Sequence, residues 1–267
     1  MKQLTIIKIG GNVIDNSANL HQFLLDFTAL PGHKILVHGG GKIATDLGHT
    51  LGVEAKMVEG RRVTDVETLR VVTMVYAGLI NKNMVAQLQA KGCNAIGLTG
   101  ADGNIIKAKK RPIVKVGQTE IDYGFVGDLD ESSIASATLQ NLLNAGLTPV
   151  LCAITHDGNT QLLNTNADTI ASAVAVAMSS LYQTRLIYCF EKKGVLKNVD
   201  DDETVVREIR TQEFDALKAD GTVAGGMIPK LYNAFEAIKK GVSAVYIGKA
   251  DELNQLEKGS FGTKMLN

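Results

Sequence analysis

Two glycine-rich turns near the N-terminus have the composition of a phosphate-binding site. Gly10 and Gly11 follow one short apolar segment, and Gly39–Gly41 follow the next. Glycine lets backbone N–H groups approach a ligand closely, and a helix that begins at such a turn adds free donors and partial positive charge. Lys8 stands beside the first turn. Our working hypothesis is therefore a site that holds a phosphate group and transfers it.

Two further cationic residues stand in glycine-led segments. Arg62 lies in the loop 60–64, and its guanidinium offers a fork that matches a carboxylate or a phosphate. Lys230 follows Gly225 and Gly226 near the start of an expected helix. A lysine there opposes the helix dipole, so it requires a compensating anion. Both residues favour an anionic ligand.

Polar side chains also precede an almost wholly apolar helix expected over 169–178. Asn164, Asn166 and Asp168 lie between that helix and the strand before it. Two amides and a carboxylate in this position indicate a polar site. Helix capping by Asn166 or Asp168 explains the same residues without a ligand.

The second glycine turn has two other interpretations. Residues 39–44 match G-x-G-x-x-[GA], and Glu59 follows at a distance that suits contact with a ribose, which predicts an NAD-binding oxidoreductase. Alternatively, both turns are tight turns that bind nothing. The P-loop pattern G-x-x-x-x-G-K-[ST] is absent from the sequence, which argues against a P-loop NTPase.

The composition narrows the class of partner. The 267 residues include 28 Lys and Arg against 28 Asp and Glu, so no basic excess indicates nucleic acid. The short basic run 107–111 is typical of a solvated hairpin. No apolar run approaches the ~20 residues that span a bilayer, and the N-terminus lacks the pattern of a signal peptide. We expect a cytoplasmic protein without a membrane partner.

Neither the cysteines nor the acidic run indicates a metal site. Cys93, Cys152 and Cys189 are far apart in apolar surroundings and form no C-x-x-C pair. We expect buried thiols in a reducing compartment. The side chains of Asp200–Asp202 point in different directions, so this run predicts a solvated hairpin tip.

Strand-like and helix-length segments alternate along the chain, which predicts an α/β fold with a mostly parallel sheet and helices on both faces. The periodicity predicts helices over 18–30, 42–51, 65–91, 132–144, 169–178, 211–218 and 229–240. It predicts strands over 95–98, 149–154, 185–190 and 244–247, antiparallel hairpins between 104 and 130, a hairpin turn at 157–158, and an edge strand over 262–266.

The order of these motifs resembles the N-acetylglutamate kinases, a branch of the amino acid kinase superfamily. The resemblance covers essentially the whole chain and rests on Lys8-x-Gly10-Gly11, Gly39–Gly41, Arg62-Val63-Thr64, Asn164-x-Asn166-Ala167-Asp168 and Gly226-Met227-x-x-Lys230. It implies a three-layer sandwich around an open, mainly parallel eight-stranded sheet. Residues 1–184 would form the lobe that binds the acylglutamate, and residues 185–267 the nucleotide lobe.

The resemblance implies transfer of the γ-phosphoryl group of ATP to the γ-carboxylate of an N-acylglutamate in arginine biosynthesis. The acyl group would be acetyl, with succinyl as the alternative. A carboxylate is ionised at pH 7, so the nucleophile needs no general base. Mg²⁺ would bridge the β- and γ-phosphates without protein ligands, and no tightly bound cofactor is expected.

Roles carry over from the family to matching positions. Lys8 and Lys230 would hold the migrating phosphoryl group, with Asp168 orienting both. The phosphates of ATP would meet backbone N–H groups of the glycine turns, namely Gly10, Gly11, Gly39 and Gly226. The acyl substrate would be held by Gly40, Gly41, Arg62, Asn164 and Asn166, with Arg62 on its α-carboxylate.

One segment departs from the family's pattern. After the strand residues 186–189 the family has Ser or Thr, then Asp, then an aliphatic residue, whereas Phe190, Glu191 and Lys192 stand here. This segment should face the nucleotide, so Glu191, Lys193 and Gly194 are its candidate contacts. The departure also motivates a third alternative, a catalytically inactive sensor with the kinase fold.

The resemblance further implies a homodimer, with the helix 65–91 as its interface. Arginine-inhibited relatives carry an extra N-terminal helix. This chain begins at its first strand, so we expect no arginine feedback.

Overall fold

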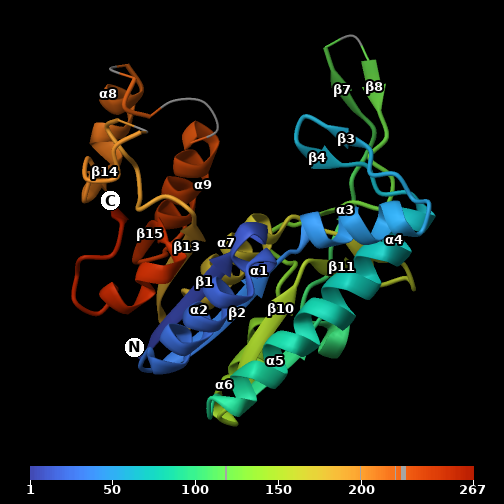
Figure 1. The fold of residues 1–267 in the computed structure, drawn as a ribbon, viewed down its shortest axis with the longest axis horizontal. Helices are drawn as coiled ribbons and strands as arrows, with labels where there is room; N and C mark the ends of the chain where they lie inside the picture. Colours follow the sequence, from blue (N-terminus) through green and yellow to red (C-terminus); the bar gives the residue numbers. More distant parts are fainter. Residues whose placement is uncertain (118, 199, 220, 224–226) are drawn as a thin grey trace.

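An eight-stranded sheet runs through the molecule (Figure 1). The computed structural model describes residues 1–117, 119–198, 200–219, 221–223 and 227–267. The six strands from β15 to β5 are mutually parallel, whereas β16 runs antiparallel to β15. The strand order is β14 (Glu208–Arg210), β16 (Thr263–Leu266), β15 (Ala244–Lys249), β13 (Gln183–Phe190), β1 (Gln3–Ile9), β2 (His33–His38), β10 (Thr148–Cys152), β5 (Ala95–Leu98).

Helices cover both faces of this sheet. On one face α7 packs on β13, β1 and β2, with α6 and α9 beside it, and on the other α5 packs on β5 and β10 next to α2. The helices are α1 (Gly11–Asp15), α2 (Ser17–Ala29), α3 (Gly41–Thr50), α4 (Val66–Thr73), α5 (Asn81–Ala90), α6 (Ser136–Asn144), α7 (Ala167–Met178), α8 (Phe214–Ala219) and α9 (Met227–Lys239). Short 3-10 helices are η2 (Asp102–Asn104), η3 (Thr211–Glu213) and η4 (Ala250–Gln255).

Side-chain alternation along β1 places the charged group of Lys8 on the face of the sheet that α7 covers. Because successive side chains of a strand point to opposite faces, Lys8 faces α7, whereas Thr5 accepts a hydrogen bond from Arg185 on the η4 side. The apolar residues of β1 are fully buried, as expected for a central strand covered on both faces. Because β13, β1 and β2 are adjacent and parallel, their carboxyl ends lie side by side at one end of the sheet, with β1 in the middle.

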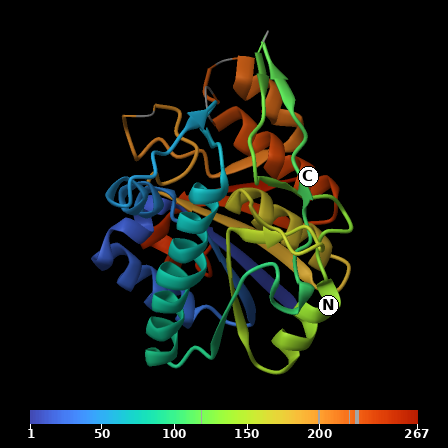
Figure 2. The ribbon, with the colours of Figure 1, turned by 90° about the vertical axis from the view of Figure 1, so that its right-hand side faces the viewer.

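Four small two-stranded antiparallel sheets lie outside the eight-stranded sheet in the described residues. The pairs are β3 (Met57–Val58) with β4 (Arg61–Arg62), β6 (Lys109–Lys110) with β9 (Gly127–Asp128), β7 (Val114–Val116) with β8 (Thr119–Ile121), and β11 (Ile154–His156) with β12 (Leu162–Asn164). The β7–β8 hairpin projects beyond the sheet in both views (Figures 1 and 2). The expected hairpins between 104 and 130 and at 157–158 are confirmed.

The predicted α/β architecture with an eight-stranded sheet is confirmed, and several elements differ from expectation. The helix expected from 132 begins at Ser136, because Asp130 accepts from the Ser132 amide and closes a turn first. The strand expected over 149–154 divides into β10 and β11. β16 is not an edge strand, since β14 pairs outside it.

The helix expected over 65–91 changes its winding in the middle. Asp65 caps its start by accepting from the Thr68 amide. Between α4 and α5, residues Met74–Ile80 form a π-helix. π-helical turns inside α-helices occur frequently at functional sites. This one faces the glycine turn after β2, as the site geometry below shows.

The three cysteines are buried and free, as expected. Burial raises the pKa of the Cys152 thiol to about 12 and also raises that of Cys189. In the part of the chain that the structure describes, no helix is long and apolar enough to cross a bilayer.

Candidate active site

Lys8 and Asp168 form an ion pair at the carboxyl end of β1. Their Nζ and Oδ1 atoms lie 2.9 Å apart, and Lys8 is almost completely buried. Asp168 is in the first turn of α7, where a carboxylate is favoured by the helix dipole. Asn166 caps this helix by accepting from the Thr169 amide at 3.0 Å. The capping and the ion pair thus share one helix terminus.

The turn after β2 favours glycine at its centre, because the backbone there has a conformation that other residues rarely adopt. Gly40 has φ +143°, and a Cβ there would lie 2.1 Å from Cδ1 of Ile80, in the π-helix. A Cβ at Gly39 would lie 3.8 Å from that of Ala167, at the start of α7. α3 begins at Gly41, so this turn has the helix that the phosphate-site hypothesis requires. The turn after β1 opens only the five-residue α1, which contributes a much weaker dipole.

A buried histidine holds the Gly39 carbonyl. His38 Nδ1 lies 2.9 Å from that oxygen, which can only accept, so Nδ1 carries the proton. Nε2 then accepts from Nδ2 of Asn81, at 3.0 Å. Burial lowers the pKa of His38 to about 4, so its ring is neutral at pH 7. His38 therefore ties the glycine turn to the first residue of α5.

The first cavity, here called the Arg62 cavity, has a volume of about 410 Å³. Arg62 donates from Nη2 to the Gly41 carbonyl at 2.9 Å and to Thr45 Oγ1 at 2.7 Å. Asn164 donates to Thr64 Oγ1 at 3.0 Å. The predicted site residues that line it are Lys8, Gly11, Gly39, Gly40, Gly41, Arg62, Asn164, Asn166 and Asp168. Residues from four separate segments thus converge on one cavity.

The second cavity, here called the Lys230 cavity, has a volume of about 360 Å³ and is lined by the first glycine turn, the loop after β13 and the start of α9. Burial, with repulsion from Lys8 as a smaller cause, lowers the pKa of Lys230, while Asp168 opposes the shift. Its predicted site residues are Gly10, Gly11, Glu191, Gly194 and Lys230. Gly11 lines both cavities. Gly226 lies outside the described residues.

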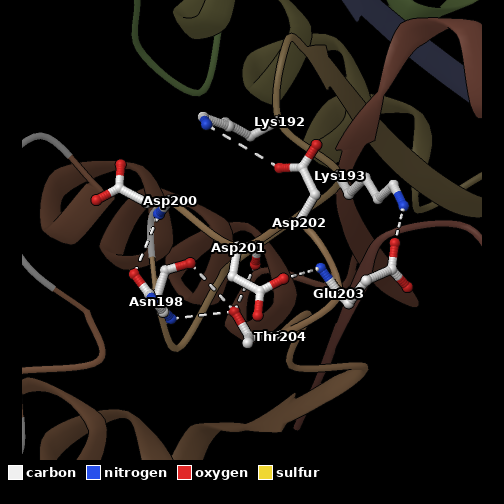
Figure 3. A network of polar contacts seen from close by, with 8 residues as sticks. All are labelled: Lys192, Lys193, Asn198, Asp200, Asp201, Asp202, Glu203 and Thr204. Atoms are coloured by element: carbon white, nitrogen blue, oxygen red, sulfur yellow. Dashed lines mark hydrogen bonds and ion pairs between the residues drawn. The ribbon is translucent and has the colours of Figure 1, made fainter.

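The loop after β13 is held by pairs among its own charges (Figure 3). Lys193 pairs with Glu203 at 2.6 Å, and Lys192 lies 4.0 Å from Asp202. Asp201 accepts from the Glu203 amide at 2.9 Å, which closes the turn expected at 200–202. The structure therefore places the Lys193 ammonium beside Glu203, whereas Glu191 and Gly194 line the Lys230 cavity.

Several lining residues were not singled out in the sequence. Tyr76 comes from the π-helix, and Arg111 comes from the basic run expected to be solvated. Only 13% of the Arg111 side chain is exposed, because it makes a forked pair with Asp128, with Nη2 2.5 Å from Oδ1. Asn12 donates to Glu191 and links the loops after β1 and β13. These positions carry no local motif, and only the fold brings them to the site.

The interpretation as a dinucleotide fingerprint fails on the position of its acidic residue. Glu59 lies in the turn between β3 and β4, outside the eight-stranded sheet, with φ +48°. In the dinucleotide motif an acidic residue at this spacing contacts the ribose from within the βαβ unit. The glycine turn here instead belongs to the Arg62 cavity.

Comparison with known proteins gives a consistent result. The model of the amino acid kinase family matches residues 3–249. Acetylglutamate kinase of Bacteroides thetaiotaomicron is 53% identical over 256 residues, which is 96% of this chain and 97% of that protein. Acetylglutamate kinase of Cytophaga hutchinsonii is 53% identical over 268 residues, covering 100% and 99%. A crystal structure of a Streptococcus mutans protein has a TM-score of 0.76 at 27% identity, covering 98% of both chains.

Proposed function

Because the chain belongs to the amino acid kinase family and, within it, to the acetylglutamate kinases, we infer that it phosphorylates the γ-carboxylate of an N-acylglutamate with ATP. The identity over nearly full length carries this conclusion. The products are an acyl phosphate and ADP, and the reaction is a step of arginine biosynthesis. N-acetyl-L-glutamate is the expected substrate, and N-succinyl-L-glutamate is the alternative acceptor.

The chemistry requires positioning and charge neutralisation more than proton transfer. An oxygen of the γ-carboxylate attacks the γ-phosphorus, and the bond from that phosphorus to the β,γ-bridging oxygen breaks. The carboxylate is already ionised at pH 7, so no general base is required. Negative charge spreads over the transferring phosphoryl group, and fixed cations and N–H donors stabilise it.

Lys8 and Lys230 are proposed to hold this phosphoryl group. Lys8 lines the Arg62 cavity and Lys230 lines the Lys230 cavity, which supports an approach to the phosphoryl group from opposite sides. Asp168 fixes the Lys8 ammonium at 2.9 Å. Backbone N–H groups of Gly11 and Gly40 are proposed to complete the phosphate contacts.

The acyl substrate is proposed to occupy the Arg62 cavity. The Arg62 guanidinium is held from behind by the Gly41 carbonyl and Thr45, which leaves its charge for the α-carboxylate. Asn164 would contact the amide, and Gly40 and Gly41 would form the floor. Residues 1–184 would thus serve the acceptor, and residues 185–267 the nucleotide.

ATP is proposed to enter the Lys230 cavity as its Mg²⁺ complex. Among the described residues no three His, Cys, Asp or Glu side chains cluster as a metal site, and Asp168 is paired with Lys8. The phosphate oxygens are proposed to hold the ion, whose positive charge would offset their negative charge. Glu191 and Gly194 line this cavity and are proposed to contact the nucleotide.

A cytoplasmic homodimer completes the proposal. Three apolar side chains along the segment 66–80 are about half exposed, namely Val66, Met74 and Leu79. Such side chains suit the interface expected on this helix. Light scattering of the purified protein would show twice the chain mass, and a monomer would contradict this part.

ADP release with Mg-ATP tests the function, with N-acetylglutamate and N-succinylglutamate offered separately and hydroxylamine present to trap the acyl phosphate. Turnover with one acceptor establishes the reaction and selects the acyl group. No hydroxamate from either acceptor, in protein that binds ATP, would favour the inactive sensor. NAD(H) binding without ATP binding would instead favour the oxidoreductase.

A further inference from the structure

Phe190 stands between the two lysines of the proposed phosphoryl site. It ends β13 and lines the Lys230 cavity. The Lys230 Nζ atom lies 3.9 Å from the centroid of its ring, and the Lys8 Nζ atom lies 5.5 Å from the same centroid. A cation within about 6 Å of an aromatic face is attracted by the ring quadrupole. One uncharged side chain thus contacts both cations.

The strand register explains how one ring reaches both lysines. Lys8 on β1 is paired with Tyr188 on β13, so both side chains lie on the face covered by α7. Phe190 is two residues beyond Tyr188 and therefore lies on the same face. The two rings stack with 6.2 Å between centroids and 20° between planes. Tyr188 is itself fixed, since its hydroxyl donates to the Asp168 carbonyl at 3.3 Å.

The charges around Lys230 show why a neutral partner is useful. Lys8 repels its ammonium group, and Asp168 is already paired with Lys8. Glu191 and Lys192 line the same cavity. A carboxylate at position 190 would attract the ammonium strongly and would compete with the phosphates. An aromatic face attracts it more weakly, so the contact orients the lysine yet leaves it available to a phosphate.

We propose that Phe190 is a positioning residue, whose ring holds the ammonium groups of Lys8 and Lys230 at the places from which they stabilise the transferring phosphoryl group. This role rests on the proposed kinase function. The sequence departs from the family's pattern at this position, so the role is specific to chains with an aromatic residue here.

The first test compares Phe190→Leu with Phe190→Tyr. Loss of the ring should lower kcat about 2- to 30-fold, the range of one to two cation–π contacts, with a smaller change in the KM for the acyl acceptor. Phe190→Tyr keeps the ring and should restore most of this loss. Phe214→Leu is the matched control. The Lys218 Nζ atom lies 5.0 Å from the centroid of the Phe214 ring, and this cation–π pair is away from both cavities. That control should retain the native kcat.

Fluorinated phenylalanines at position 190 separate electrostatics from packing. Each added fluorine withdraws electron density from the ring face with little change in shape, so kcat should fall stepwise along the series. A flat series would overturn the proposal even if Phe190→Leu is impaired or fails to fold, because the ring would then act by packing alone.

A titration without substrates separates this role from the kinase reaction. NMR of the lysine side chains should show the Lys230 pKa falling along the fluorinated series, because the ring face favours the charged form and added fluorine leaves the burial of Lys230 almost unchanged. An unchanged pKa would overturn the proposal. If neither acylglutamate is phosphorylated, the proposed function fails, and this titration still decides whether the ring supports the cation.

Discussion

The two cavities are built from different kinds of contact. The walls of the Arg62 cavity are fixed by buried groups, namely the Gly40 backbone against Ile80, the neutral His38, and Arg62 on the Gly41 carbonyl. The loop beside the Lys230 cavity is held by charged pairs such as Lys193 with Glu203. Buried hydrogen bonds enforce one geometry, whereas exposed ion pairs contribute little stability. We therefore infer that the Arg62 cavity is the more rigid of the two, and that the loop beside the Lys230 cavity is ordered more by its ligand.

The largest effect is expected where the two cavities meet. Lys8→Met and Lys230→Met should each lower kcat ~10²–10³-fold, because each removes a charge from the transferring phosphoryl group. The double variant should lose less than the product of the two, since both lysines act on one group. ADP release measures this, with Lys109→Met as the surface control. A kcat within threefold of native in either single variant would contradict the assigned role.

The rigid side should be the more sensitive to a single methyl group. Gly40→Ala should destabilise the protein by about 2–4 kcal/mol, because its φ of +143° is strained for alanine and its Cβ would overlap Ile80. Urea denaturation measures the loss. Gly60→Ala, with φ +72° and open space around it, is the control for backbone strain alone. Equal losses in the two variants would show that the contact with Ile80 is unimportant.

The rigid side should also be sensitive to acid. Since the folded pKa of His38, about 4, lies below its unfolded value near 6.5, the unfolded state binds more protons between these pH values. Above about pH 6.5 His38 is neutral in both states and does not lower the free energy of unfolding. As the pH is lowered further, the free energy of unfolding decreases, by about 2 kcal/mol at pH 5. Urea denaturation at pH 7.5 and pH 5 should show this loss, and His38→Gln should reduce the difference. An identical pH dependence in both proteins would exclude His38 as the cause.

The smallest effect is expected on the charged loop. Lys193→Ala should change Tm by less than about 2 °C, because its pair with Glu203 is exposed. It should change the KM for ATP less than about threefold, because the ammonium group is directed to Glu203. Glu203→Gln serves as the partner control. A tenfold rise in the KM for ATP with Lys193→Ala, but not with Glu203→Gln, would show that Lys193 contacts the nucleotide.

The sequence predicted this frame well, because the parallel strands and their glycine turns carry local patterns. Lys8, Gly40 and Asp168 could be placed from such motifs. Tyr76 could not, since a π-helix leaves no distinct pattern in hydrophobic spacing. Arg111 was misjudged because its partner Asp128 is distant in sequence and buries it only after the hairpin forms. The role of Phe190 depends on the register of β1 with β13, which only the structure displays.

Gly11 lines both cavities, so the two proposed binding spaces adjoin at this residue. A single molecule that joins an acylglutamate to adenosine through a chain of phosphates would occupy both at once. Once its first half is bound, the second half meets its pocket at an effective concentration of about millimolar or higher. Such a bisubstrate compound should exceed the affinity of either half by roughly 10²–10⁴-fold. The shared glycine therefore gives inhibitor design a natural point at which to place the linker.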